Sequence, residues 1–168
     1  RSTLSPSSAA SDGYKRQDIL MIVRHNDRYP EYNSTVVYID KIPVATNQTT
    51  SLLMKDYTKQ SCVPIKVLKY FCYHLDGKDT YKLPSMSPES CFIPLEGRTG
   101  KEPDFTNLAL VDNFYKYDKY HSVVKYCNGF KKILPIQKRH LIELADKYLR
   151  LYACLLYTSD AADDGESV

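Results

Sequence analysis

The sequence predicts an α/β fold built from a strand of a parallel sheet and a helix that packs on that strand. The strand spans Ile19 to Val23, five consecutive apolar residues, which is typical of a strand buried on both faces. The helix spans Leu134 to Ala153, where apolar residues recur at helical spacing. Residues 31–127 lie mostly between the two and are expected to form a long, loop-rich insertion.

Composition places the chain among ordinary globular proteins. It has 168 residues, 43% of them apolar, and a formal net charge of +3. Residues 1–17 open with a Ser- and Ala-rich stretch and are predicted to be a disordered leader. Since no apolar run reaches the roughly 20 residues that a membrane helix needs, a membrane is expected as a partner only through an anchor upstream of Arg1.

The C-terminal residues have an unusual sequence. Cys154 to Asp163 read Cys-Leu-Leu-Tyr-Thr-Ser-Asp-Ala-Ala-Asp, which resembles a sequencing adapter translated in one frame. We therefore predict that residues 154–168 are an artefact and that the native sequence stops near Ala153. The segment holds four acidic and no basic residues, so the remainder has a net charge of +7, which favours anionic substrates.

Between the strand and the helix, local patterns predict short elements. Thr35 to Ile39 is β-branched and predicts a strand, and the partial alternation of Val63 to Tyr73 predicts another. Prolines and glycines divide Leu83 to Asp104 into turns. The spacing of apolar residues in Asp104 to Tyr120 predicts a short helix.

Cysteines and glycosylation sequons favour the secretory pathway. Outside the tail there are four cysteines, an even number that fits two disulfides with three possible pairings: Cys62, Cys72, Cys91 and Cys127. Asn33 and Asn47 each begin an Asn-x-Ser/Thr sequon. The predicted location is therefore the Golgi lumen, the lysosome or the extracellular space.

Two other types of site have weak signals in the sequence. The cysteines together with His74 form a weak zinc pattern, but structural zinc uses a tight Cys-x2-4-Cys knuckle and none is present, so no metal is predicted. Tyr115 to Tyr120 interleaves lysines with tyrosines, as a nucleic-acid surface does. A solvated helix face explains it better, and no nucleic-acid partner is predicted.

Three residues directly after the predicted strand form the candidate site: Arg24, His25 and Arg28. In open α/β sheets, ligands bind at the carboxyl ends of strands. Guanidinium groups offer planar forks to phosphate oxygens, and an imidazole between them can attack the phosphorus. The alternative is a solvated basic turn in which His25 is an ordinary surface residue.

The pattern Arg24-His25-x-x-Arg28-x-Pro30 resembles the Arg-His-Gly-x-Arg-x-Pro signature of the histidine acid phosphatases, branch 2 of the histidine phosphatase superfamily. Its Asp-Arg-Tyr-Pro ending is most similar to the 2-phosphoxylose phosphatase branch. Leu134 to Ala153 resembles a helix of the same family. The resemblance implies that residues 18–153 are the N-terminal part of such a domain, with an incomplete phosphoglycerate-mutase-like core.

The resemblance also implies a mechanism. His25 would form a phosphohistidine intermediate, and Arg24 and Arg28 would bind the phosphate of a phosphorylated sugar, glycan or other small ester, with no cofactor and no metal. Asn26 replaces the family's Gly, and the family's downstream acid and further Arg do not occur in the chain, so the chain itself is expected to be inactive. The alternative function is a lumenal or secreted binding protein that keeps the fold without catalysis.

Overall fold

A computed structural model of the chain describes residues 18–25, 31–60, 63–77, 83–95 and 102–166. These residues form a mixed α/β fold with two antiparallel sheets. The six-stranded sheet, in the order β3-β2-β1-β6-β5-β4, contains β1 (Ile19–Arg24), β2 (Ser34–Tyr38), β3 (Val44–Thr46), β4 (Ser85–Ser87), β5 (Ser90–Leu95) and β6 (Asp104–Asn107). The three-stranded sheet contains β7 (Val111–Lys116), β8 (Ser122–Tyr126) and β9 (Lys131–Leu134), in that order.

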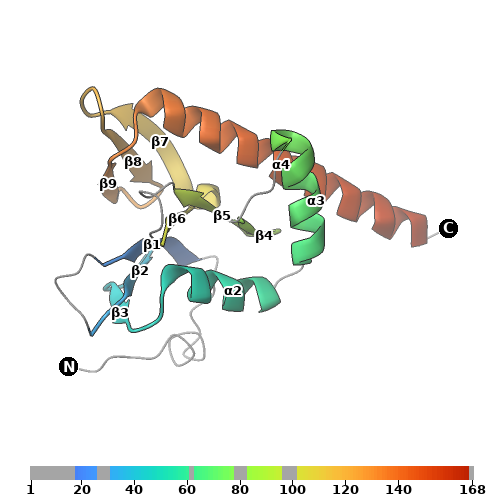
Figure 1. Cartoon of the computed structure of the whole chain (residues 1–168), viewed down its shortest axis with the longest axis horizontal. Coiled ribbons are helices and arrows are strands. Elements are labelled where there is room, and N and C mark those ends of the chain that lie inside the picture. The colour runs from blue at the N-terminus through green and yellow to red at the C-terminus, as the bar shows by residue number, and fades with distance from the viewer. Residues whose placement is uncertain (1–17, 26–30, 61–62, 78–82, 96–101, 167–168) are drawn as a thin grey trace.

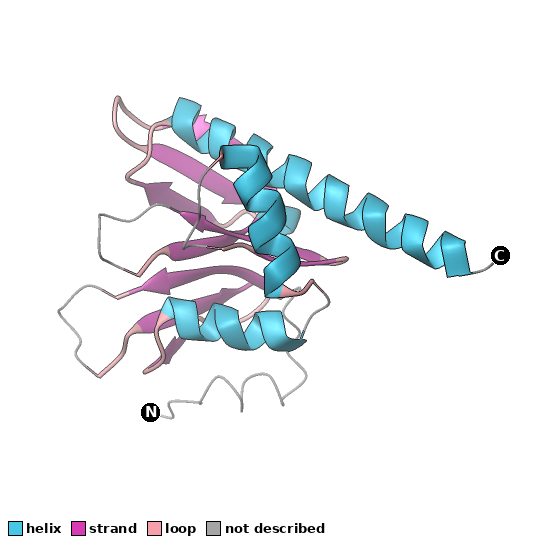
Figure 2. Cartoon of the chain, turned by 45° about the vertical axis from the view of Figure 1, so that its right-hand side comes forward, coloured by secondary structure: helices cyan, strands magenta, loops and turns pink. Residues whose placement is uncertain are grey.

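The helices within the described residues are α2 (Thr50–Gln60), α3 (Ile65–Asp76), α4 (Lys138–Glu166) and the short 3₁₀ helix η2 (Leu108–Leu110). Figure 1 shows α4 beside the three-stranded sheet at the top of the view and α2 at the bottom. Figure 2 shows that α4 extends well past the strands toward the C-terminus. The predicted leader, residues 1–17, lies outside the described residues.

The central strand β1 is where the predicted parallel sheet proves wrong. Both of its neighbours, β2 and β6, run antiparallel to it. Its apolar run reflects burial on both faces, which a covered antiparallel sheet also provides. A bulge between Ile19 and Met21 directs Leu20 and Met21 to one apolar cluster, whereas Ile19 and Ile22 join the other.

The two clusters lie on opposite faces of the six-stranded sheet. The cluster on the α2 face consists of Ile19, Ile22, Val36, Tyr38, Leu53, Met54, Tyr57, Phe92 and Phe105. The opposite cluster joins the sheet to α3, α4 and the three-stranded sheet, and contains Leu20 and Met21 together with Leu68, Val124, Leu134 and Leu141. The side chains of Leu20, Met21 and Ile22 are completely buried. β1 therefore forms the centre of the fold.

The segment 31–127 is more regular than expected. It contains β2 to β8, α2 and α3, so the prediction of a loop-rich insertion is wrong. The strand predicted at Thr35 to Ile39 is confirmed as β2. The turns predicted for Leu83 to Asp104 are wrong where β4 and β5 form a hairpin with an all-buried pattern.

The strand predicted for Val63 to Tyr73 is wrong. Most of this segment belongs to the helix α3, which begins at Ile65. Leu68 and Cys72, four residues apart, are buried on its inner side, and this helical spacing outweighs the partial alternation. Gly77 ends the helix with a left-handed backbone (φ 68°), and its N–H donates to the Tyr73 carbonyl at 2.7 Å.

The helix predicted for Asp104 to Tyr120 is also wrong. The segment contains β6, η2 and β7, because each strand has a distant partner. β6 pairs with β1 and β5, and β7 pairs with β8 in a hairpin. Long-range pairing has overridden a local helical spacing here.

The helix predicted for Leu134 to Ala153 is confirmed as the N-terminal part of α4. Leu141, Ala145, Tyr148 and Leu151 are buried in the cluster shared with β1. α4 continues through the tail as far as Glu166, with Leu155 buried; the adapter origin of residues 154–168 stays a prediction.

Candidate functional site

Arg24 and His25 lie at the carboxyl end of β1, as the sequence predicts. Arg24 is the last residue of the strand, opposite Ser34 of β2. The backbone N–H of His25 still donates to the Asn33 carbonyl at 2.9 Å, so the chain is paired through His25. Both residues are partly buried. The two residues therefore occupy a fixed position at the carboxyl end of an inner strand of the six-stranded sheet.

The His25 ring contacts two residues of the neighbouring segment, which contains β2. Its Nε2 forms a hydrogen bond with the Thr35 hydroxyl on β2, and its ring meets that of Tyr32 edge-on, with centroids 6.5 Å apart. Its Nδ1 is inaccessible to solvent. The imidazole is thus held by β2 on the face of the sheet that carries Val37 and the α4 cluster.

Arg24 follows the alternation of an extended strand, which directs successive side chains to opposite faces. Its neighbour Ile22 belongs to the α2 cluster, whereas His25 contacts Thr35 on the other face. The described part of the site therefore does not bring the Arg24 guanidinium and the His25 imidazole together on one face. Arg28 lies in residues 26–30, outside the described residues, and its role stays a prediction.

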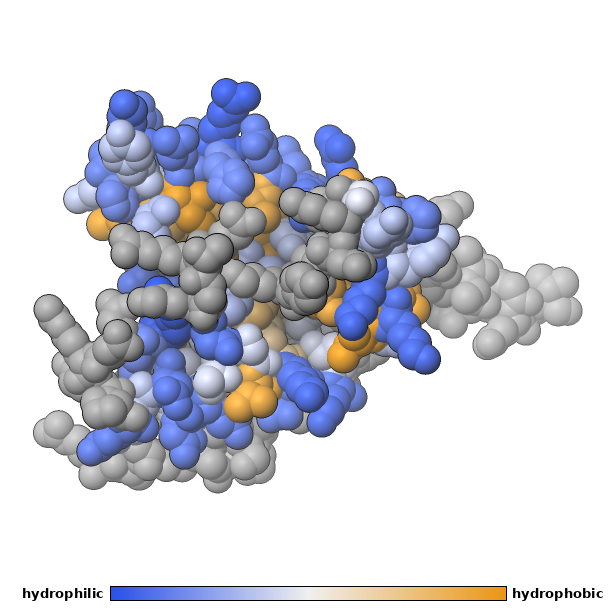
Figure 3. Space-filling view, in the orientation of Figure 1, coloured by the Kyte–Doolittle hydropathy of each residue, from blue (hydrophilic) through white to orange (hydrophobic). Residues whose placement is uncertain are grey.

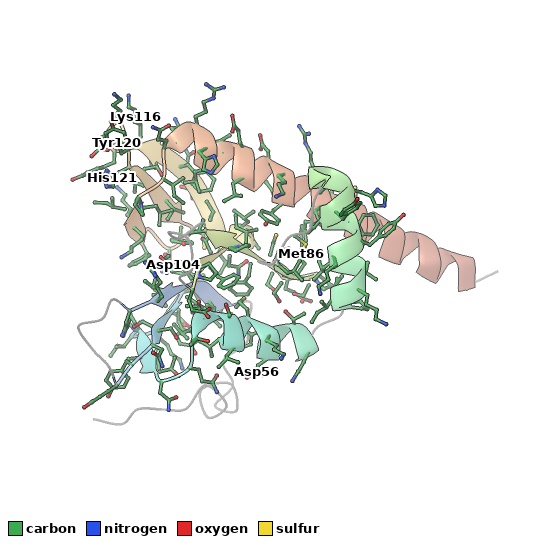
Figure 4. The ribbon with its side chains drawn as sticks, in the orientation of Figure 1. Asp56, Met86, Asp104, Lys116, Tyr120 and His121 are labelled. Atoms are coloured by element: carbon green, nitrogen blue, oxygen red, sulfur yellow. The ribbon has the colours of Figure 1, made fainter. Side chains whose placement is uncertain are left out.

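Asp104, at the start of β6, is a site residue that the sequence analysis missed. Its Oδ1 accepts a hydrogen bond from the Arg24 backbone N–H at 2.8 Å. Burial raises the pKa of this carboxyl, while the Arg24 N–H and the charges of Arg24 and Lys132 act in the opposite direction. Figure 4 shows Asp104 between the two sheets.

A buried tyrosine continues this polar cluster into the core. Tyr126 of β8 is completely buried, and its hydroxyl forms a hydrogen bond of 2.7 Å with the hydroxyl of Thr106. Burial and the nearby Asp104 carboxyl raise the pKa of Tyr126 far above its usual value, so it stays protonated. Asp104 and Tyr126 are single polar residues in otherwise ordinary strands, and no motif marks them in the sequence.

The predicted disulfides are not seen among the described residues, which include Cys72, Cys91 and Cys127. Cys62 lies outside the described residues, so a pairing that involves it stays a prediction. Burial raises the pKa of the Cys91 thiol to about 12, which keeps it protonated and unreactive. Cys127 is exposed.

The two sequon asparagines lie side by side. Asn33 and Asn47 are both exposed, and the Asn33 side-chain amide donates to the Asn47 carbonyl. The backbone N–H of Asn33 also donates to the Thr46 carbonyl at 2.8 Å. Both acceptor residues are accessible at the surface, and their glycosylation stays a prediction.

A cavity of about 230 Å³ opens elsewhere, between α2, the start of α3 and β6. Met54, Leu68 and Phe105 form apolar parts of its wall, and Lys55 is its charged residue. His25 does not line it. The cavity is smaller than the roughly 300–1,000 Å³ typical of small-molecule sites.

Within the described ranges there is no group of three or more His, Cys, Asp or Glu side chains placed to hold a metal ion. None of the described helices has the length and apolar character needed to span a membrane. No family model matches the chain, and no curated protein or solved structure matches it either.

Proposed function

We propose that this chain belongs to a phosphomonoester hydrolase in which His25 accepts the phosphoryl group. The observation that supports this most is the position of Arg24 and His25 directly at the end of the buried central strand. The proposal rests on the signature residues, because the antiparallel neighbours of β1 remove the parallel core that the family resemblance implies.

In the proposed reaction, a ring nitrogen of His25 attacks the phosphorus of a sugar phosphate or another small phosphate ester. The bond between phosphorus and the ester oxygen breaks, and the leaving alkoxide takes up a proton. Water then attacks the phosphohistidine, which releases inorganic phosphate and restores the imidazole. Arg28 would stabilise the negative charge on the phosphate oxygens, and Arg24 would join it only after its side chain turns toward the face of His25.

A second candidate function is phosphate-ester binding without catalysis. The surroundings of His25 favour it, because Nε2 is bonded to the Thr35 hydroxyl and Nδ1 is inaccessible to solvent. A substrate must displace Thr35 before Nε2 can attack. A lumenal or secreted binding protein would use the same arginines and would leave this hydrogen bond in place.

The two functions are separated by mixing the chain with p-nitrophenyl phosphate, whose leaving group needs little protonation. The hydrolase proposal predicts a burst of nitrophenolate of about one equivalent per chain, absent in His25→Ala. No turnover beyond this burst is expected, because the chain does not contain the acid that the family uses for catalysis. The matched control is His74→Ala, which removes an exposed histidine of α3.

Binding of inorganic phosphate is followed in parallel by ³¹P NMR. Phosphate binding that is lost in Arg28→Ala, with no nitrophenolate burst, would establish the binding function instead. A chain that neither binds phosphate nor releases nitrophenolate would contradict both.

A further inference from the structure

The cavity beside α2 has an apolar interior. Met54, Leu68 and Phe105 form parts of its wall and are almost completely buried, with exposed fractions of 4%, 0% and 3%. They come from α2, α3 and β6, so three separate elements enclose the same space. Pro84 and Pro103, which have no backbone N–H to offer, line it as well. An apolar group that enters this space is therefore removed from water on several sides.

The opening of the cavity is polar, and one side of α2 supplies its polar groups. Four of the lining residues follow the spacing i, i+3, i+4 and i+7, which places side chains on one side of a helix: Ser51, Met54, Lys55 and Thr58. Met54 is buried, whereas Ser51 and Lys55 are exposed and Thr58 is partly buried. Figure 3 shows apolar side chains among hydrophilic ones over the part of the molecule that contains α2 and the start of α3.

The charge at the opening is a single cation. Of the described residues that line the cavity, Lys55 alone is charged. No carboxylate in the described ranges forms an ion pair with it. Glu102 directly precedes the lining residue Pro103, and its carboxylate accepts from the Ser51 backbone N–H at 3.2 Å. Lys55 is therefore available to one negative charge, whereas Glu102 disfavours a second.

The volume of the cavity, about 230 Å³, sets the size of its ligand. Since an apolar cavity of about 150 Å³ in a protein core can hold benzene, this space fits one aromatic ring with a short side arm. The Met54 thioether and the Phe105 ring are both favourable neighbours for an aromatic ring. A rigid ring also loses less conformational entropy on binding than a flexible alkyl chain does.

We propose that this cavity binds a small aromatic carboxylic acid, with its ring against Met54, Leu68 and Phe105 and its carboxylate at the Lys55 ammonium group. A phosphate ester fits less well, because a dianion would meet the negative charge of Glu102 and only one cation. His25 does not line the cavity, so this site goes beyond the function proposed for His25 and does not depend on it.

Methionine methyl signals test the location of this site in the unaltered chain. The chain has three methionines, of which Met54 lines the cavity and Met21 and Met86 do not. With ¹³C-methyl methionine labelling, titration of the full chain with phenylpropionate should shift the Met54 signal, which the Met54→Leu variant assigns. The signals of Met21 and Met86 should keep their positions. The shift should saturate with a dissociation constant of about 0.1–1 mM, as expected for so small a ligand.

Phenylpropanol, a neutral compound of nearly the same shape, tests the role of the charge. It should bind about fivefold more weakly than phenylpropionate. Lys55→Gln removes the ammonium group and should weaken phenylpropionate binding about fivefold while leaving phenylpropanol binding within about twofold. The matched control is Lys59→Gln, which removes the same charge from an exposed position of α2 outside the cavity and should bind both compounds like the wild type.

Five outcomes would overturn the proposal. The first two are an unshifted Met54 signal up to about 10 mM phenylpropionate, and shifts confined to Met21 or Met86. The others are equal binding of phenylpropanol and phenylpropionate by the wild type, equal effects of Lys55→Gln and Lys59→Gln, and tighter binding of phenyl phosphate when it is followed at Met54.

Discussion

The backbone N–H of Arg24 donates a hydrogen bond to Asp104 Oδ1 at 2.8 Å, although the two residues are 80 positions apart in the chain. The bond joins the end of β1 to the start of β6, next to His25. It makes the geometry of the candidate site depend on a partly buried carboxyl. The ionisation of Asp104 therefore links the stability of the fold to the site.

We expect the Asp104→Asn variant to be less sensitive to pH than the wild type. Burial raises the pKa of Asp104 in the folded state, so its contribution to stability is present at low pH and is lost as the pH rises through that pKa. The amide keeps an oxygen that accepts from the Arg24 N–H but cannot ionise. Urea unfolding from acid to neutral pH should therefore give a flatter profile for the variant.

The control for this profile is Asp56→Asn, which removes one carboxylate from the exposed side of α2. Since both variants change the net charge equally, a difference between their profiles reports the effect of burying Asp104. A wild-type free energy of unfolding that rises, relative to Asp104→Asn, over the acid range would contradict the assigned direction of the pKa shift.

The buried hydrogen bond between Tyr126 and Thr106 should contribute measurably to stability. Tyr126→Phe leaves the Thr106 hydroxyl buried without this partner, and the expected loss is about 1–3 kcal/mol in the free energy of unfolding. Tyr120→Phe removes a hydroxyl from an exposed tyrosine and should change the free energy by less than ~0.5 kcal/mol. Equal effects of the two substitutions would argue against the packing of β8 on β6.

α4 should stabilise the fold through its buried stripe. Leu141 is fully buried, so Leu141→Ala should lower the free energy of unfolding by about 2–5 kcal/mol. Leu149 is 46% exposed on the same helix, and its replacement by Ala should cost far less. Urea denaturation of the two variants tests which side of α4 faces the core. A larger loss of stability for Leu149→Ala than for Leu141→Ala would contradict the orientation described above.

Thr35 should restrain His25 if Nε2 is the attacking atom. Thr35→Val removes the hydroxyl bonded to Nε2, and we expect the nitrophenolate burst to become about fivefold faster, the factor that a hydrogen bond of ~1 kcal/mol represents. Stopped-flow absorbance measures the burst rate. A slower burst in this variant would instead show that Thr35 orients the ring for attack.

The sequence predicts helix α4 correctly because its buried residues, Leu141, Tyr148 and Leu151 among them, fall on one stripe that only a helix can bury. It also predicts the burial of Ile19 to Ile22 from their unbroken apolar run, whereas Val23 is only partly buried. The apolar run carries no information on the direction of the neighbouring strands, which come from Ser34–Tyr38 and Asp104–Asn107. The prediction of a parallel sheet is wrong because strand direction cannot be read from this run.

The candidate site is predictable only where it is contiguous in sequence. Arg24 and His25 lie at the strand end as expected, because a polar turn directly follows an apolar run. Thr35, Asp104 and Tyr126 reach the region from three other strands, through pairings that local sequence does not encode. The same long-range pairing explains why the helix expected at Asp104 to Tyr120 is strand instead.

The most direct test of the central proposal is to map the phosphoryl group after the chain reacts with an activated aryl phosphate and is quenched at high pH. Mass spectrometry should find one phosphoryl group on the peptide that contains His25, labile in acid and stable in base. It should be absent in His25→Ala and retained in His74→Ala. A phosphoryl group on any other residue, or an adduct that persists in His25→Ala, would contradict the assignment of His25 as the phosphate acceptor.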